Sequence, residues 1–377
     1  MPSPLFAGIP ADGPGTRNWM QIPPLQQRPA LPAAPRRIVS IGAGAIVRQA
    51  HMPAYRRAGW PLSSVFDTDR PRAEALARDF GVARVCSSLD EAVSSAPDGA
   101  VFDLALPASA ILGVLAALPD GAPVLIQKPL GEDLAKATAI RDLCRRKRLV
   151  AAVNLQLRSA PNMIAARDIV SRGLIGDLHD VDIRVTCSMP WHLWTFLYGI
   201  PRMEIIYHSI HYVDLVRSFL GEPAGVWCKT QRHPEMMELA STRTAIAFDY
   251  GDVVRANVAT NHGHRFGTRH QESVLKLEGT RGAAVVRMGG NLDYPRGMPD
   301  GLEYCVTGDG GAPAWTSVRL EGSWFPDAFV GPMAGLMRFA SGESGDLPTS
   351  VEDAWRTMAV IEACHASSDR GATPIPS

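Results

Sequence analysis

A short apolar segment that ends in Gly-x-Gly has the clearest chemistry in this sequence. Residues 38–41 are followed by Gly42-Ala43-Gly44 and then by a helix-like stretch that starts at Ala45. Glycines at such a turn let the backbone approach a pyrophosphate, and a helix N-terminus adds free N–H donors and the positive end of its dipole. The segment therefore predicts a dinucleotide-binding turn formed by Gly42, Gly44, Ala45 and Ile46.

An acidic residue follows at the separation that such a site needs. Asp67 lies 25 residues after Gly42, at the end of the apolar segment 62–66. An acid in this position binds the adenosine ribose hydroxyls of NAD and repels the 2′-phosphate of NADP. NAD is the predicted cofactor and NADP the second choice, because Arg70 and Arg72 lie nearby. Since Val47 occupies the third glycine position, an ordinary glycine-rich turn is the alternative.

Lys128 is the second candidate for chemistry. It follows the apolar segment 123–126 in the sequence Gln127-Lys128-Pro129. The carboxyl ends of strands border the ligand crevice in open α/β sheets, and a proline restricts the residue before it to extended backbone. We expect the Lys128 ammonium to enter the crevice and to stabilise charge on a substrate oxygen. A surface lysine at a strand end is the alternative.

The third candidate is a histidine-bearing segment, residues 203–217, whose apolar residues recur at helical spacing. Tyr207, His211 and Asp214 are separated by four and three residues and share one face of such a helix, and His208 borders it. Histidine is the usual group that takes a hydroxyl proton near neutral pH. The alternatives are core or surface roles for the histidines and helix bracing for Asp214.

These three features together resemble the glucose–fructose oxidoreductase and inositol dehydrogenase family, Gfo/Idh/MocA. The resemblance extends from about residue 36 to the end and is strongest at 38–67, 122–158 and 203–221. It implies an α/β fold: a Rossmann domain, then an α/β domain with a large, mostly antiparallel open sheet. It also implies a homodimer or homotetramer formed through that sheet.

Within the resemblance, Lys128 and His211 match the family's catalytic lysine and histidine. The family's Glu-Lys-Pro motif stands here as Gln127-Lys128-Pro129, which removes a charge near the nicotinamide. Its Asp-x-x-x-His motif stands as Tyr207 to His211, so that a tyrosine replaces the aspartate. We expect Tyr207 to assist the proton path or to position the sugar. Gln127, Lys128 and Pro107 are expected to border the cofactor.

Four further residues are candidates for substrate binding: His208, Arg158, Trp191 and His192. Arg158 follows Asn154 and Gln156 where the chain enters the second domain, and could bind a carboxylate or sugar hydroxyls. Trp191 and His192 lie in an aromatic-rich loop that could stack on a sugar ring. Core packing is an alternative for the aromatic loop.

A metal site is not predicted. His262 and His264 form an H-x-H pair, which could hold a metal from one strand face. Because the sequence offers no evident third ligand, the prediction is that no metal is bound.

Alternating strand and helix patterns divide the chain. They run from residue 37 to about 155 and predict a parallel sheet covered on both faces. Strand-like runs at 181–186, 225–231, 242–249, 252–260, 272–278 and 283–288 predict the second sheet. The stretch 289–314 is predicted to be a long loop. The expected domains are a Pro-rich, disordered or loosely docked arm (1–35), a Rossmann domain (36–155) and a substrate domain (156–377), with a terminal helix near 351–367 that packs back on the first domain.

Composition limits the function classes. The formal net charge is zero, which gives no reason to expect a nucleic-acid or anionic-membrane partner. No apolar stretch approaches the roughly 20 residues of a membrane span. The six cysteines are scattered without a C-x-x-C pair, which indicates free thiols in a reducing compartment, the cytoplasm.

The sequence therefore predicts an NAD(P)-dependent oxidoreductase that transfers hydride between nicotinamide and a secondary hydroxyl or ketone of a sugar, polyol or sugar derivative. Three alternatives stay open. A lyase could retain its NAD and oxidise the sugar only transiently. The protein could be a non-catalytic NAD-binding sensor, or a plain carbohydrate-binding protein.

Overall fold

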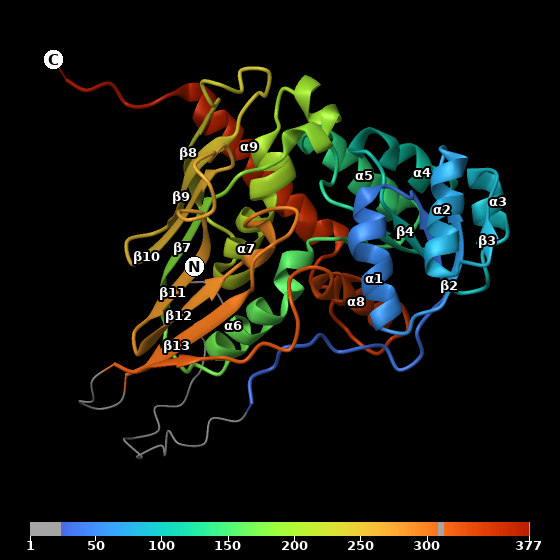
Figure 1. Ribbon diagram of the computed structural model, residues 1–377, viewed down its shortest axis with the longest axis horizontal. Coiled ribbons are helices and arrows are strands. Elements are labelled where there is room, and N and C mark those ends of the chain that lie inside the picture. The colour runs from blue at the N-terminus through green and yellow to red at the C-terminus, as the bar shows by residue number, and fades with distance from the viewer. Residues whose placement is uncertain (1–23, 308–312, 377) are drawn as a thin grey trace.

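The computed structural model describes residues 24–307 and 313–376, which form two sheets with helices packed around and between them (Figure 1). Of the predicted N-terminal arm, residues 1–23 lie outside this part of the chain. Residues 24–35 have no regular structure but are hydrogen bonded to later segments. The amide of Gln26 donates to Asp168, and that of Ala33 to Glu343.

Sheet A is the predicted Rossmann sheet, with six strands in the order β3-β2-β1-β4-β5-β6, all paired in parallel. The strands are β1 (Ile38–Ile41), β2 (Leu62–Phe66), β3 (Arg84–Val85), β4 (Val101–Leu104), β5 (Pro123–Ile126) and β6 (Val150–Val153). Every residue of β1, β4 and β5 is buried, as expected where helices cover both faces. The strand order reverses between β1 and β4, and ligands of such sheets bind at the carboxyl ends of the strands near that point.

The helices of this part follow the predicted pattern. A π-helical turn, η3 (Val47–His51), leads into α1 (Met52–Arg57), and then come α2 (Arg70–Phe80), α3 (Leu89–Ser94), α4 (Ile111–Ala117) and α5 (Leu134–Arg146). The Asp69 side chain accepts a hydrogen bond from Arg72 N at the start of α2, and Gly81 ends that helix in the left-handed conformation. These are the cap residues that such helix ends favour.

Sheet B has eight strands in the order β14-β13-β12-β11-β7-β10-β9-β8 and is antiparallel except for the pair β7 and β10. The strands are β7 (Leu178–Thr186), β8 (Gly225–Gln231), β9 (Arg243–Tyr250), β10 (Val254–Asn261), β11 (Glu272–Gly279), β12 (Gly282–Arg287), β13 (Gly301–Val306) and β14 (Trp315–Ser317). Helices α6 (Pro161–Ser171) and α7 (Ile210–Leu220) lie between this sheet and sheet A (Figure 1). The predicted fold class is confirmed.

Two elements differ from the predictions. The stretch 289–314, predicted to be a long loop, contains β13, which pairs with β12 and β14. Its glycine- and proline-rich flanks conceal the strand in the sequence. Helix α8 (Val330–Ala340) was not predicted either, and it packs against β5 and β6 although it follows sheet B in the chain.

The terminal helix α9 (Val351–Arg370) contacts both parts of the molecule. It packs against α5 and β6 at one end and against α7 and β8 further along. Trp355 donates its indole N–H to Thr138 on α5, and Arg145 pairs with Glu352. Across residues 24–307 and 313–376, no helix is both long and apolar enough to cross a membrane.

Candidate active site

The turn after β1 leaves room for a ligand at the start of a helix. Gly42 adopts φ +109°, and a Cβ at this position would lie 2.3 Å from the carbonyl oxygen of Ala105. A Cβ on Gly44 would meet no described atom within 4 Å, and Ala45, where the helix begins, is exposed. The first N–H groups of a helix have no partner within it. Open space in front of those donors fits a phosphate group.

Asp67 lies beside this turn, as predicted. Its carboxylate accepts hydrogen bonds from Ala43 N at 2.7 Å and from Asp69 N at 2.8 Å. A carboxylate has about four acceptor positions, so two bonds leave capacity for ribose hydroxyls. Arg70 pairs with Glu74, and Arg72 pairs with Asp69. Arg70 thus has an acidic partner on α2 and Arg72 one at the start of that helix, which weakens their case as a 2′-phosphate site.

Lys128 lies at the carboxyl end of β5 and reaches the second part of the chain. Its Nζ donates a hydrogen bond to the backbone carbonyl of Tyr207 at 2.7 Å. Burial lowers the pKa of the Lys128 ammonium to about 8, because low-dielectric surroundings disfavour the charged form. Gln127, directly before it, is buried and accepts a hydrogen bond from Asn154.

The histidine helix begins with a π-helical turn, η8 (Ile205–Ser209), before α7. Such turns are rare in proteins, and those that occur are often found at functional sites. His211 is buried, and its Nδ1 has no hydrogen-bond partner among the described residues. Burial and then the positive charge of Lys128 lower its pKa well below the usual range. His211 is therefore a neutral imidazole close to Lys128, and it can accept a proton.

A buried acid–histidine pair that sequence reasoning missed lies beside His208. Glu204 is fully buried, and one carboxylate oxygen lies 3.1 Å from His262 Nδ1. Glu204 also accepts hydrogen bonds from Ser209, Thr244 and Thr260. Burial raises the pKa of Glu204, but His262 and the hydroxyl groups of Ser209 and Thr244 outweigh it and lower the pKa overall. The described residues hold no cluster suited to a metal ion.

His208 lies near both this pair and Lys128. Its ring is 5.0 Å from the ring of His262 and 5.0 Å, edge-on, from that of Trp191. Burial, then His262, Lys128 and His211, lower the pKa of His208 well below its usual range. Trp191 is buried, whereas His192 is exposed. Of the two predicted loop residues, only Trp191 therefore packs within the histidine cluster.

Tyr207 presents its ring to an aromatic loop. The Phe196 ring lies 5.7 Å away, and the exposed side chains of Leu193, Phe196 and Tyr198 come from the same loop. Burial and the nearby Glu132 carboxylate raise the pKa of the Tyr207 hydroxyl. That hydroxyl is therefore protonated at neutral pH and can donate a hydrogen bond.

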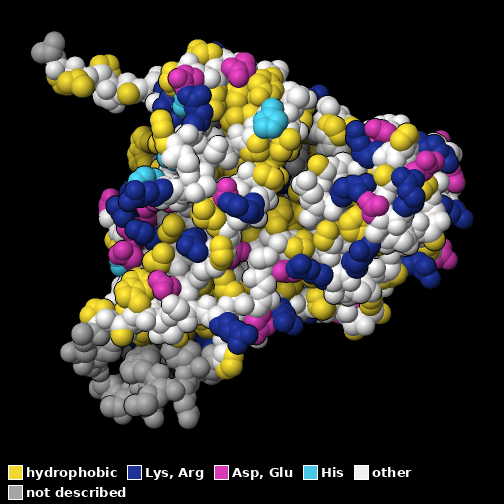
Figure 2. All heavy atoms as spheres, viewed as in Figure 1, with side chains coloured by type: hydrophobic (Ala, Val, Ile, Leu, Met, Phe, Trp, Pro, Cys, Tyr) yellow, Lys and Arg dark blue, Asp and Glu magenta, His cyan; other side chains and the backbone are white. Residues whose placement is uncertain are grey.

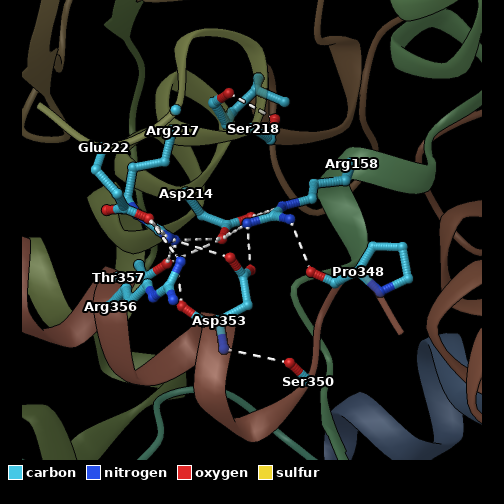
Figure 3. Close-up of polar contacts among 12 residues, drawn as sticks. Arg158, Asp214, Arg217, Ser218, Glu222, Pro348, Ser350, Asp353, Arg356 and Thr357 are labelled. Atoms are coloured by element: carbon cyan, nitrogen blue, oxygen red, sulfur yellow. Dashed lines mark hydrogen bonds and ion pairs between the residues drawn. The ribbon is translucent and has the colours of Figure 1, made fainter. Parts of the chain in front are cut away.

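Arg158 has contacts that differ from its predicted role. Its guanidinium makes two hydrogen bonds to Asp214, with Nε 2.6 Å from Oδ2, and a third to Asp353 on α9 at 2.7 Å (Figure 3). It also donates to the carbonyl of Pro348. Asp214, whose role was left open, accepts from Thr357 as well. These contacts support a bracing role for both residues instead of contact with substrate.

Comparison with known proteins agrees with this geometry. Residues 36–155 match the model of an oxidoreductase family with an NAD-binding Rossmann fold, and residues 163–285 match the GFO/IDH/MocA C-terminal domain. The chain belongs to the Gfo/Idh/MocA family. It is therefore an oxidoreductase whose first domain binds NAD, and the observed turn, open helix N-terminus and Asp67 fit that cofactor.

Similar members of the Gfo/Idh/MocA family include sugar-converting enzymes. The 1,5-anhydro-D-fructose reductase of Ensifer adhaerens is 26% identical over 251 residues, 66% of this chain and 74% of the relative. The D-apiose dehydrogenase of Rhizobium rhizogenes is 22% identical over 345 residues, 84% and 90% of the two chains. A levoglucosan dehydrogenase solved with NADH and levoglucosan has a TM-score of 0.74 at 18% identity, over 89% of this chain and 98% of the other.

Proposed function

We propose that this Gfo/Idh/MocA oxidoreductase interconverts a secondary hydroxyl and a ketone on a sugar, polyol or sugar derivative, with NAD as hydride carrier. The observation that carries the proposal is the 2.7 Å hydrogen bond from the Lys128 ammonium to the carbonyl of Tyr207, which lies four residues before the buried His211 on the same helical segment. A cation beside a neutral imidazole is the pair of groups that alcohol oxidation needs. The named activities of the similar enzymes support carbohydrate as the substrate class.

Each residue has a defined task in this proposal. Bound NAD supplies the redox chemistry by accepting hydride from the reacting carbon or returning it. Neutral His211 takes the hydroxyl proton during oxidation and gives it back during reduction. Lys128 donates a hydrogen bond to the reacting oxygen and stabilises its partial negative charge. The Tyr207 hydroxyl donates to the sugar or extends the proton path.

The substrate wall is proposed to be aromatic. Trp191 packs edge-on against His208, and Phe196 packs against Tyr207. Tryptophan and phenylalanine faces stack on the apolar faces of sugar rings, and His208 can hydrogen-bond a hydroxyl. Because of its ion pairs, Arg158 is left out of this proposal. In the face shown in Figure 2, hydrophobic side chains gather where the two parts of the molecule meet.

The test is an absorbance assay for NADH with purified protein, NAD⁺ and a panel of sugars, polyols and sugar acids, with the corresponding ketones and NADH in reverse. Turnover of one compound class by the wild type and its loss in Lys128→Met would support the proposal. Arg145→Ala, an exposed substitution on α5, is the control variant. Absence of turnover across the panel, in the presence of measured NAD binding, would contradict it.

We also propose that copies of the chain associate through the outer face of sheet B in the cytoplasm. Trp227 on β8 is 64% exposed, and Ala245 on β9 and Ala259 on β10, which pair with each other in the same sheet, are small and exposed. All six cysteines are free, in keeping with a reducing compartment. Light scattering after chromatography tests the association: Trp227→Glu should reduce the measured mass to that of a monomer, and a monomeric wild type would contradict it.

A further inference from the structure

A chain of buried polar side chains runs through sheet A to the residue beside Lys128. His51 ends the π-helical turn η3, and Tyr55 follows on α1. Asp103 lies in the centre of β4, Asn154 follows β6 and Gln127 follows β5. All are buried. A carboxylate inside a sheet destabilises the fold unless it is hydrogen-bonded, so Asp103 depends on its contacts with His51 and Tyr55.

Hydrogen bonds connect these side chains without interruption. Asp103 Oδ2 lies 2.9 Å from His51 Nδ1 and accepts from the Tyr55 hydroxyl at 3.0 Å. On the other side of the imidazole, Asn154 Nδ2 lies 3.2 Å from His51 Nε2. The same Asn154 nitrogen donates to Gln127 Oε1 at 2.9 Å. The carboxylate of Asp103 is thus linked to the Gln127 amide through one histidine and one asparagine.

The direction of each bond follows from the chemistry of the groups. An ionised carboxylate only accepts, so His51 Nδ1 carries the hydrogen. The Asn154 nitrogen only donates, so His51 Nε2 is the acceptor in that hydrogen bond. The second Asn154 hydrogen binds Gln127 Oε1, which fixes the Gln127 amide. Its nitrogen, with two hydrogens, has no partner among the described residues.

We propose that Asp103, His51 and Asn154 are positioning residues for the cofactor. They hold Gln127 so that its amide nitrogen, a neutral double donor beside Lys128, faces the nicotinamide half of the dinucleotide. The groups it recognises are then acceptors, the carboxamide or ribose oxygens. This inference rests on the proposed position of Gln127 at the cofactor and concerns the polarity of that contact.

The first test reverses the direction of the hydrogen bond between residue 154 and Gln127 with one substitution. Asn154→Asp is nearly isosteric but cannot donate, so that Gln127 must turn its nitrogen inward and present its carbonyl oxygen to the cofactor. The dissociation constants of NAD⁺ and NADH, measured by calorimetry on the full chain, should each rise about tenfold or more. Asn162→Asp is the matched control, because Asn162 is equally buried and donates to Arg287 O away from sheet A.

The outcomes separate positioning from stability. If both variants lose similar stability and only Asn154→Asp loses affinity, the proposal holds. Unchanged affinity in Asn154→Asp would overturn it.

A second measurement needs no stable variant of Asn154. ¹⁵N NMR of histidine-labelled wild type, with His51 assigned through His51→Gln, should show a neutral ring protonated at Nδ1, whereas protonation at Nε2 would overturn the proposal. Wild-type protein that binds no NAD would contradict the proposed function instead, because the tautomer is measured without cofactor.

Discussion

The Lys128 ammonium donates a hydrogen bond to the backbone carbonyl of Tyr207, 2.7 Å away. The donor follows a strand of sheet A, and the acceptor lies in the π-helical turn that leads into α7. This contact joins the two motif-bearing segments through a main-chain atom, so it does not depend on which side chain stands at position 207. Replacement of the family's aspartate by tyrosine is therefore compatible with the placement of Lys128.

Activity should fall in the alkaline range because of Lys128. Its pKa is lowered to about 8 by burial, so the ammonium loses its charge above that pH, well before an exposed lysine would. We expect kcat/KM to decline above pH about 8. Lys128→Met should lower kcat about 10²- to 10³-fold. The residual activity of Lys128→Arg should lack the alkaline decline, and an unchanged decline in that variant would show that another group causes it.

The acidic limb of the pH profile should lie unusually low because of His211. Its pKa is lowered well below the usual range by burial and by Lys128, so the imidazole stays neutral as the pH falls through that range. We expect kcat/KM for oxidation to persist below pH about 6.5, where an unperturbed histidine would be protonated. His211→Asn should lower kcat about 10²- to 10⁴-fold. A loss of this size in His208→Asn, together with only a small loss in His211→Asn, would assign the proton transfer to His208 instead.

Tyr207→Phe tests the hydroxyl alone. The ring contact with Phe196 and the carbonyl bonded to Lys128 survive this substitution, so protein stability should be nearly unchanged. If the hydroxyl donates to the sugar or the proton path, kcat should fall about tenfold or more, as expected when a hydrogen bond of about 1.4 kcal/mol is lost. Turnover equal to wild type across the pH range would exclude such a role.

Local sequence patterns predicted most of sheet A and the motif residues, whereas contacts between residues far apart in the sequence could not be predicted. The cap residues of α2, Asp69 and Gly81, directly flank the helix in the sequence, so the bounds of the helix could be read from it. Helix α8 contains Gly331, Pro332 and Gly335, which are weak helix formers, and it is stabilised by packing against β5 and β6. The pair Glu204 and His262 joins residues 58 positions apart. No periodicity connects such residues, so only the fold could reveal the pair.

Asp67 should determine cofactor choice. Its carboxylate lies beside the glycine turn, bonded to Ala43 N, where a 2′-phosphate would be repelled. Asp67→Ser should raise the dissociation constant for NAD⁺ and lower that for NADP⁺. The ratio of the two constants, which measures the preference for NAD⁺, should therefore fall about tenfold or more. Calorimetry with both nucleotides measures it. Asp79→Ser, on an exposed ion pair at the far end of α2, is the control. A preference unchanged by Asp67→Ser would place the ribose elsewhere.

Arg158 should matter for stability far more than a surface arginine. Its side chain is 12% exposed and pairs with Asp214, which is 2% exposed. Arg158→Leu leaves the Asp214 carboxylate buried with its main cationic partner removed, and such losses cost about 3–5 kcal/mol. The free energy of unfolding from urea titration measures this cost. Arg145→Leu is the matched control, because its pair with Glu352 is 56% and 44% exposed and should contribute about 1 kcal/mol or less. The two substitutions remove the same kind of ion pair and differ only in how deeply that pair is buried. Equal losses of unfolding free energy would show that the Arg158 network in Figure 3 does not brace α7 against α9.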